Sequence, residues 1–247
     1  MSGAPSPGVR SSTPARGYIL LMSHMRSHSS LLAHILGSHP EIDGYSELHL
    51  SYLGPTDLRA MTPLIEKATG RRRRGRYALD KVLHNDKVVD ASILRRDDVR
   101  TIFLLRHPAG TIPSLMRITD NRVRADQAVG YYLARLEQLD RYSALAGHRA
   151  AFVEAERLVA DAAVELGRLT RYLGLATPLE PTYERFPLSG VEGHGDFSPN
   201  ILAGKVLRDD ERDPGSVAPA EIPAETMEPA LAAYDALRSA MLSRHPG

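Results

Sequence analysis

Apolar residues along the chain gather in short unbroken runs that are separated by polar stretches. Residues 18–22 form the first such run, which is typical of a central parallel strand covered on both faces. Three further runs, at residues 77–83, 100–105 and 151–154, are also strand candidates, and each is followed by a stretch with the pattern of a helix. The pattern therefore predicts strands and helices in alternation.

Helical spacing of apolar residues predicts the main helices. We expect a helix over residues 29–36, capped by Gly37 and ended before Pro40, because proline cannot continue a helix. Further apolar residues recur at helical spacing over residues 129–139, 162–173 and 227–241. Gly174 is the expected end of the second of these helices, and a second strand is expected shortly before residue 44.

Alternating strands and helices build a parallel sheet with helices on both faces. We therefore expect one α/β domain over residues 17–247, with ligands binding in the crevice at the carboxyl ends of the strands. Residues 1–16 are rich in Ser, Pro and Gly and are expected to form a flexible leader. Residues 189–220 hold many Gly, Pro and Asp residues, which predicts a long surface loop that could fold over a ligand.

Composition and charge exclude several classes of protein. With 43% hydrophobic and 25% charged residues, the chain is expected to be globular and not disordered. Its 31 basic and 30 acidic side chains nearly balance, so no global field favours nucleic acid as a partner. The absence of cysteine excludes disulfides, thiolate nucleophiles and cysteine-ligated zinc. No apolar run approaches the roughly 18 residues of a membrane span. The cytoplasm is the default location and does not follow from these patterns.

A polar loop follows the first predicted strand and leads directly into a helix. Backbone N–H groups at such a helix start, together with the helix dipole, favour a bound phosphate or sulfate. Arg26 adds a fixed charge, and Ser27, Ser29 and Ser30 add hydroxyl donors. The alternative is a plain turn, in which the serines cap the helix and the arginine faces solvent. The loop lacks the lysine and the magnesium-binding hydroxyl that a nucleoside-triphosphate enzyme needs.

A second cluster lies where the strand at residues 100–105 ends. Arg106 follows this strand directly, and Ser114 comes eight residues later on the next predicted helix. An arginine at the carboxyl end of a central strand points into the ligand crevice, where a nearby serine can share the same oxyanion. The alternative is an arginine that pairs with an acidic side chain at the edge of the sheet.

Together these two clusters resemble the two cofactor-binding segments of the sulfotransferase family, whose fold is similar to that of the P-loop kinases. The resemblance implies a three-layer sandwich in which helices flank a central parallel sheet. It also implies 3′-phosphoadenosine 5′-phosphosulfate (PAPS) as the sulfuryl donor, the 3′,5′-bisphosphate PAP as product, and no metal. In the family the first segment holds the 5′-phosphosulfate, and its counterparts here are Arg26, Ser27, His28, Ser29 and Ser30.

The second segment of the family holds the 3′-phosphate with an arginine and with a serine eight residues later, which Arg106 and Ser114 match. The first segment departs from the family at one position. His28 stands where many members carry glycine, so the backbone there must accept a side chain or follow a different path. The order and the separation of the two segments make the resemblance more specific than either segment alone.

Sulfuryl transfer to a hydroxyl needs a base and a cation. Glu47 lies where many bacterial and carbohydrate-directed sulfotransferases place a glutamate base, although a loop glutamate that caps a helix or pairs with an arginine is the alternative. His84 is the second candidate base, because it follows Lys81 by three residues where cytosolic members have a gap of two. Lys81 is one of only four lysines beside 27 arginines, which favours a point charge near the leaving-group oxygen over a random exposed lysine.

Two further basic features have looser interpretations. Residues 193–205 are similar to the third, Gly-rich segment of the family, which closes over the 3′-phosphate and adenine, and this similarity assigns Gly204 and Lys205 to the cofactor site. A loop without ligand contact is the alternative. The arginine run at residues 71–74 could steer an anion, but without interleaved aromatic residues it is expected to be a solvated face.

The sequence therefore predicts a PAPS-dependent sulfotransferase that acts on a hydroxyl of a small-molecule, carbohydrate or lipid acceptor. The catalytic candidates are Arg26, Glu47, Lys81 and His84. Two alternatives stay open, namely a P-loop-type phosphotransferase that uses ATP and magnesium, and a nucleotide-binding module without catalysis. The class of acceptor and the presence of a homodimer are also open at this point.

Overall fold

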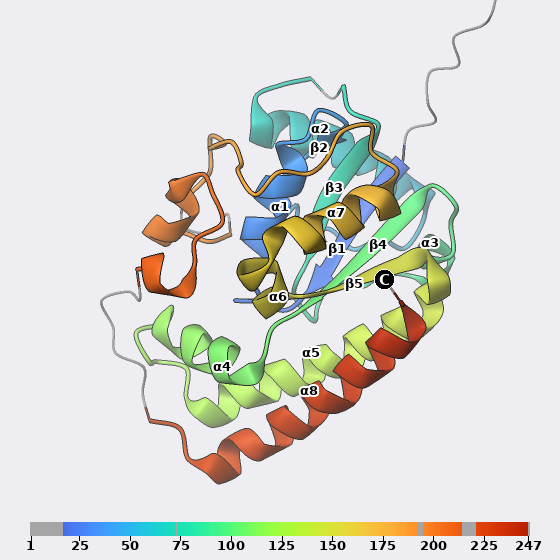
Figure 1. Cartoon of the computed structure of the whole chain (residues 1–247). Helices are drawn as coiled ribbons and strands as arrows, with labels where there is room; N and C mark the ends of the chain where they lie inside the picture. Colours follow the sequence, from blue (N-terminus) through green and yellow to red (C-terminus); the bar gives the residue numbers. More distant parts are fainter. Residues whose placement is uncertain (1–16, 73, 192–194, 214–220, 247) are drawn as a thin grey trace, which may run out of the picture.

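The computed structural model describes residues 17–72, 74–191, 195–213 and 221–246, so the predicted leader at residues 1–16 lies outside the described residues. Five strands form one sheet in the order β2-β3-β1-β4-β5, and every pair of neighbours is parallel (Figure 1). The strands are β1 (Gly17–Ser23), β2 (Ile42–Asp43), β3 (Tyr77–Val82), β4 (Val99–Leu105) and β5 (Ala150–Glu154). All the predicted strands are present, and the predicted parallel α/β sheet is confirmed.

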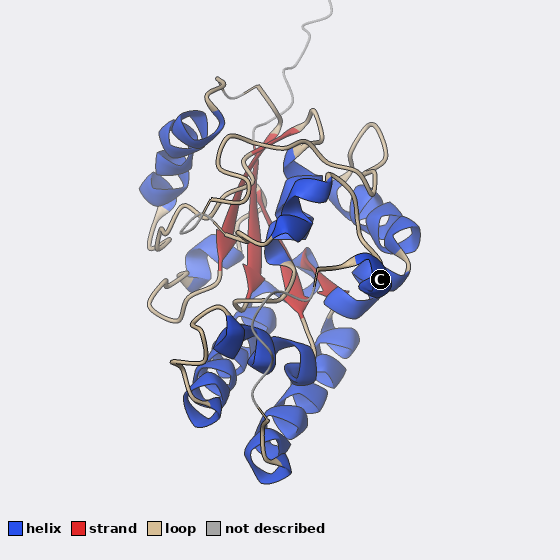
Figure 2. Cartoon of the chain, turned by 90° about the vertical axis from the view of Figure 1, so that its left-hand side faces the viewer, coloured by secondary structure: helices blue, strands red, loops and turns tan. Residues whose placement is uncertain are grey.

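Helices cover both faces of the sheet, which gives three layers (Figures 1 and 2). One face packs against α1 (Ser29–Gly37), α6 (Ala155–Ala160) and α7 (Ala162–Leu173). The other face packs against α2 (Pro55–Thr69), α3 (Ala91–Leu94), α4 (Pro108–Arg117), α5 (Ala125–Ala146) and α8 (Ala224–Arg244). Three short 3₁₀ segments are η1 (Gly147–Arg149), η2 (Pro199–Ala203) and η3 (Asp209–Glu211).

The central strand β1 explains why the first apolar run is unbroken. Successive side chains of a strand point to opposite faces of the sheet. Leu20 and Met22 pack in the core on the α5 side, whereas Ile19 and Leu21 pack in the core on the α1 side, and all four are fully buried. A strand that is covered on both faces therefore needs an apolar residue at every position.

Two details of the predicted helices differ from the structure. Gly37 is the last residue of α1 and not its cap, and Ser38 takes the cap position instead. A Cβ at Gly37 would lie 2.3 Å from the carbonyl oxygen of Gly44, so the glycine allows a close approach and does not end the helix. Helix α2 has no counterpart among the predicted helices. Gly174 does cap α7, with a left-handed φ of 60°.

A buried arginine ties the carboxyl ends of the two central strands together. The Arg135 side chain on α5 is fully buried, and burial lowers the pKa of its guanidinium group. It donates hydrogen bonds to the carbonyl oxygens of Ser23 (2.7 Å), Val82 and His84 (3.3 Å). Ser23 and Val82 are the last residues of β1 and β3, and His84 follows β3, so Arg135 fixes the sheet edge from which the loops of the site depart. No helix in the described part of the chain is both long and apolar enough to cross a bilayer.

Candidate functional site

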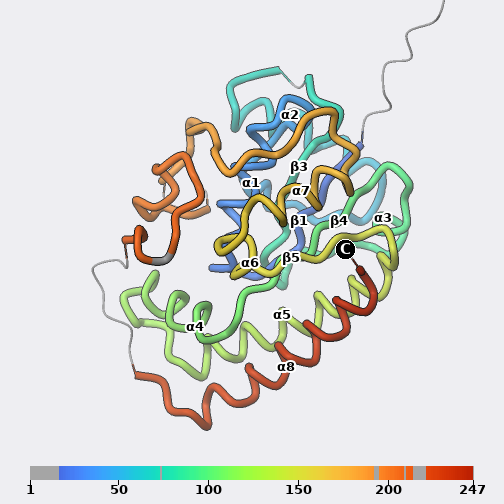
Figure 3. The backbone as a smooth tube through the Cα atoms, in the orientation of Figure 1, coloured from blue at the N-terminus to red at the C-terminus, as the bar shows by residue number. Residues whose placement is uncertain are grey.

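A cavity of about 1020 Å³ lies at the carboxyl ends of the strands, in the crevice that the fold class predicts. Its walls come from the loop between β1 and α1, from α4, from the segments that follow β2 and β3, and from residues 195–213. The backbone trace shows this last segment beside α1 and α4 (Figure 3). Most of the candidate residues line the cavity, namely Arg26, His28, Ser29, Ser30, Glu47, His84, Arg106, Ser114 and Lys205.

The loop between β1 and α1 adopts the conformation that a glycine would favour. His28 is the N-cap residue of α1 and has φ 66° and ψ 19°, which is the left-handed region, and Arg26 has φ 61°. A non-glycine residue in this region costs roughly 1–2 kcal/mol. His28 therefore adopts, with a side chain present, a backbone conformation that glycine enters more easily. The His28 side chain does not cap α1, so the first-turn N–H groups keep their capacity to bind an anion.

The serines of this loop divide into two groups. The Ser27 hydroxyl is buried and accepts a hydrogen bond of 2.6 Å from the Ser23 hydroxyl, which also lies 2.6 Å from the carbonyl oxygen of Leu104. The Ser27 side chain thus ties the loop to the ends of β1 and β4 and is not part of the cavity wall. Ser29 and Ser30 do line the cavity, as the sequence predicts.

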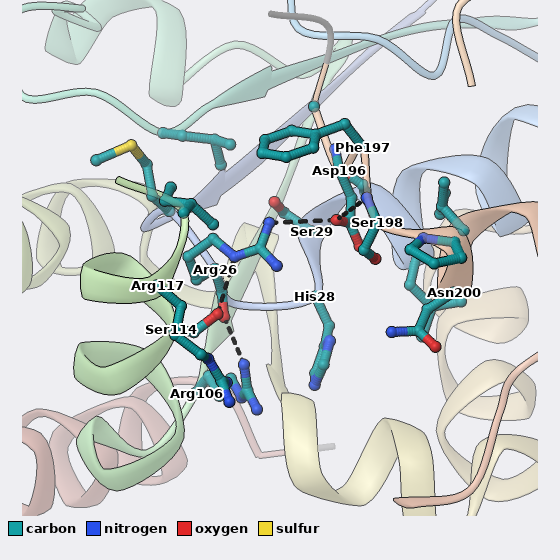
Figure 4. Close-up of a pocket in the computed structure, with 18 of the residues that line it drawn as sticks. Arg26, His28, Ser29, Arg106, Ser114, Arg117, Asp196, Phe197, Ser198 and Asn200 are labelled. Atoms are coloured by element: carbon teal, nitrogen blue, oxygen red, sulfur yellow. Dashed lines mark hydrogen bonds and ion pairs between the residues drawn. The ribbon is translucent and has the colours of Figure 1, made fainter. Parts of the chain in front are cut away.

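Arg26 and Arg106, which come from the two predicted clusters, are in contact (Figure 4). The Arg106 guanidinium donates a hydrogen bond of 2.9 Å to the carbonyl oxygen of Arg26, and Arg26 Nε donates one of 3.0 Å to the Ser114 hydroxyl. The hydrogen bond of Arg106 thus goes to a backbone carbonyl oxygen, although the charge of Glu156 also acts on its guanidinium group. Both predicted clusters therefore meet on one wall of the cavity.

This wall carries a surplus of positive charge. Burial lowers the pKa of Arg106 to about 10, and three neighbouring arginines act in the same direction against the opposing charge of Glu156. These arginines are Arg26, Arg117 and Arg212. A group of like charges in a partly buried site is stabilised by an anion that binds among them.

An acidic side chain from residues 195–213 occupies part of this wall (Figure 4). Asp196 Oδ1 lies 3.2 Å from the Arg26 guanidinium, and the Asp196 N–H donates a hydrogen bond of 3.0 Å to the Ser30 hydroxyl. The preceding Gly195 has a φ of 113°, and a Cβ there would lie 2.8 Å from the Ser30 hydroxyl and 3.0 Å from Lys81 Nζ. Residues 195 and 196 therefore pack directly against the start of α1, and the Asp196 carboxylate forms an ion pair with Arg26.

Lys81 is one of the most deeply buried side chains of the site, with only 1% of its surface exposed. Its Nζ donates a hydrogen bond of 3.2 Å to the Ser30 hydroxyl. Burial lowers the pKa of Lys81, whereas the negative charges of Glu47, Asp80 and Asp196 act to raise it. The alternative of a random exposed lysine is therefore excluded.

The two candidate bases lie side by side on the part of the cavity wall that follows β2 and β3. Glu47 Oε1 is 3.2 Å from His84 Nε2 and 3.6 Å from Nδ1 of His49, and only 6% of the Glu47 side chain is exposed. The segment that carries Glu47 is fixed by Asp80, whose carboxylate accepts the Leu48 N–H (2.8 Å). Burial raises the pKa of Asp80 to about 7. Sequence reasoning assigned no role to His49 or Asp80, although they stand in the same segments as Glu47 and Lys81.

The remaining predicted residues lie at the margin of the site. Lys205 lines the cavity, but half of its side chain is exposed and its Nζ lies 2.8 Å from Glu211. Gly204 has a φ of 70° and does not line the cavity itself, but its carbonyl oxygen accepts the N–H (2.9 Å) of Tyr183, which does. Arg71 in the arginine run is exposed and pairs with Glu184, as expected of a solvated face.

Solved structures with the same fold are sulfotransferase domains. The chain matches a sulfotransferase domain from the curacin biosynthetic pathway with a TM-score of 0.58 and 19% identity, over 92% of this chain and 99% of that one. It matches a sulfotransferase domain from the Synechococcus PCC 7002 olefin synthase with a TM-score of 0.55 and 21% identity, over 91% and 97% of the two chains.

A third match is a sulfotransferase from Alicyclobacillus acidocaldarius, with a TM-score of 0.54 and 14% identity over 93% of this chain and 95% of that one. No family model and no curated protein matches the amino-acid sequence. The likeness of the three structures confirms the sulfotransferase fold that the two sequence clusters indicate.

The buried His24 should make the free energy of unfolding depend on pH. This ring is fully buried, accepts the Arg106 N–H at Nε2 (3.1 Å), and lies with Nδ1 2.9 Å from the Met25 carbonyl oxygen. Burial lowers the pKa of His24 to about 3. Between about pH 6.5 and pH 3 the unfolded chain therefore binds one more proton at this residue than the folded chain.

The contribution of His24 to stability should consequently be greatest above about pH 6.5 and should fall on acidification by up to about 1.4 kcal/mol per pH unit. Urea denaturation of the wild type and of His24→Gln at about pH 7, 6 and 5 measures this contribution. We expect the free energy of unfolding of the variant to depend less steeply on pH. Equal slopes for the two proteins would contradict the prediction.

Proposed function

We propose that this protein is a sulfotransferase that moves the sulfuryl group of PAPS to a hydroxyl group of a small-molecule, carbohydrate or lipid acceptor. The observation that carries the proposal is the contact between Arg26 and Arg106, which follow the parallel neighbours β1 and β4. With the Ser114 hydroxyl they form a cationic wall next to the start of α1. The fold shared with three sulfotransferases supports the same assignment.

The residues of this wall fit a nucleotide with charged groups at both ends. The N–H groups at the start of α1, with Arg26, Ser29 and Ser30, would hold the 5′-phosphosulfate. Arg106 and Ser114 would hold the 3′-phosphate, because a guanidinium group suits a phosphate. The Asp196 carboxylate forms an ion pair with Arg26, so the space beside the Arg26 guanidinium group accepts an anionic oxygen. A bound donor would take the place of this carboxylate.

Residues of β3 and of the segments that follow β2 and β3 would supply the groups that sulfuryl transfer requires. The acceptor oxygen attacks sulfur, a new O–S bond forms, and the bond between sulfur and the bridging phosphate oxygen breaks. Glu47 takes the proton of the acceptor hydroxyl, and His84 beside it is a polar neighbour of the carboxylate. The buried Lys81 stabilises the negative charge that grows on the leaving oxygen. Every group in this step belongs to the described residues or to the two substrates.

The acceptor is best sought among natural products. Two structures with this fold come from a pathway and a synthase that make such compounds, namely the curacin biosynthetic pathway and an olefin synthase. The cavity wall also includes the apolar side chains of Met25 and Leu83. An alcohol with an apolar body would bury that body here and would present its hydroxyl to the carboxylate.

Replacement of the proposed base should remove turnover and leave donor binding intact. We expect Glu47→Gln to lower kcat by about 10²–10⁴-fold, because amide nitrogen and oxygen cannot take up the proton. Transfer of ³⁵S from labelled PAPS to a panel of alcohols measures kcat, and calorimetry with PAP measures binding, which should change less than about twofold. His84→Asn tests the other candidate base in the same way. If Glu47→Gln kept full turnover and His84→Asn lost it, His84 and not Glu47 would be the base.

The same assay separates the proposal from its alternatives. A magnesium-dependent phosphotransferase would bind ATP with magnesium more tightly than PAP without metal. A nucleotide-binding module would bind PAP but transfer no label to any alcohol. Either outcome would contradict the proposed function.

Removal of the negative charge at Asp196 should strengthen binding of the product PAP. The carboxylate competes with the 5′-phosphate for Arg26, so we expect Asp196→Asn to bind PAP at least threefold more tightly in calorimetric titrations at low salt. Asp120→Asn is the control, because Asp120 also lines the cavity but is exposed and has a φ of 50° that asparagine tolerates. Equal effects of the two substitutions would mean that Asp196 acts only through net charge.

A further inference from the structure

We propose that Glu47, His49 and His84 form a binding site for a divalent transition-metal ion, for which Zn²⁺ is the best fit, at the acceptor end of the cavity. The two imidazoles and one carboxylate are ligand types that zinc prefers in sites with three protein ligands and one open position. Such a site is not needed for the proposed sulfuryl transfer, and the binding inference does not depend on that function.

The spacing of the three ligand atoms fits a common ion. Glu47 Oε1 lies 3.2 Å from His84 Nε2 and 3.6 Å from His49 Nδ1, and all three atoms lie within 4.8 Å of one another. Ligands about 2.0–2.1 Å from a tetrahedral zinc ion lie roughly 3.3 Å apart. The two distances to Glu47 are therefore close to those of a formed site, and the ligand atoms of His49 and His84 lie within 4.8 Å of each other.

Glu47 Oε1 is the second observation that points to a cation. This oxygen is buried and has no hydrogen-bond partner among the described residues, although a ring nitrogen lies only 3.2 Å away. The N–H of His84 is thus not aimed at the oxygen, as it would be in a hydrogen-bonded pair. A buried carboxylate oxygen without a donor is costly and rare, and an ion between the three atoms would satisfy it.

The protein holds the three ligands in place through its backbone. His49 has a left-handed φ of 55°, which is an uncommon conformation for this residue type and one that occurs at functional sites. Asp80 accepts the Leu48 N–H between the ligands Glu47 and His49, and Tyr52 donates a hydrogen bond of 2.6 Å to the same carboxylate. His84 follows β3, and its carbonyl oxygen accepts from Arg135. Contacts of this kind orient ligands before the ion binds.

A bound ion would change the reaction proposed above. All three side chains line the cavity, so the open position of the ion would face the acceptor space. The ion would also take the lone pair of Glu47 Oε1 that the proposed function uses for the proton. If the proposed function is correct, Zn²⁺ should therefore inhibit transfer, and a chelator should restore it.

The test uses untagged full-length protein, freed of metal with a chelator and titrated with Co²⁺ and then with Zn²⁺. We expect one Co²⁺ per chain with the intense visible bands of four- or five-coordinate cobalt, and displacement of the cobalt by Zn²⁺. His49→Ala and His84→Ala should each weaken Co²⁺ binding at least tenfold. His148→Ala is the control, because His148 is exposed and lies outside the cluster, and it should bind Co²⁺ like the wild type.

Circular dichroism of each variant shows whether the fold is retained. Because His49 is exposed, His49→Ala should disturb the fold less than His84→Ala. The inference is overturned if folded wild type shows no saturable Co²⁺ binding. It is also overturned if His49→Ala binds Co²⁺ as well as His148→Ala does. Binding of the metal and transfer of labelled sulfate are separate readouts, so failure of the metal site leaves the proposed function standing, and the reverse also holds.

Discussion

Parallel pairing of β1 with β4 is the constraint on which the site depends, because it brings two arginines 80 residues apart in the chain into contact. Neither arginine could be held there by the local sequence alone. Arg135 and the Ser23 hydroxyl fix the strand ends, and His24 accepts the N–H of Arg106. The fold therefore supports a cluster of like charges that is unfavourable without an anion.

The cavity is lined by two groups of residues with different chemistry. Arginines and the N–H groups of α1 follow β1 and β4, whereas a buried carboxylate and two imidazoles follow β2 and β3. Lys81 connects the two groups, because its Nζ contacts Ser30 and its charge interacts with both Glu47 and Asp196. Such a division suits the joining of an anionic donor to a neutral alcohol, since the two substrates prefer different surroundings.

The sequence predicts much of this site because its local patterns carry the information. An unbroken apolar strand, a polar loop and a helix start locate the anion loop, and the spacing of Arg106 and Ser114 locates the second cluster. The sequence also identified Glu47 and His84 as competing bases, although nothing in it showed that they are neighbours. Their proximity depends on β2 and β3 lying side by side in the sheet.

The features that sequence reasoning missed depend on distant contacts. Asp196 forms its contact with Arg26 although the two residues are 170 positions apart. Nothing in the local sequence around Asp196 indicates that its carboxylate pairs with an arginine of the site. His49 belongs to the site only through its left-handed backbone and the position of His84. Helix α2 escaped prediction because its buried residues are sparse, at Leu58, Met61 and Ile65, and Pro63 interrupts the pattern.

We expect Arg106 to recognise the phosphate that distinguishes PAP from AMP. Calorimetric titration of the wild type and Arg106→Ala with PAP and with AMP, in the presence of a chelator, tests it most directly. We expect the wild type to bind PAP at least 100-fold more tightly than AMP, and Arg106→Ala to lose most of that preference, about 3 kcal/mol, with AMP binding little changed. Equal affinity of the wild type for PAP and AMP would contradict the claim.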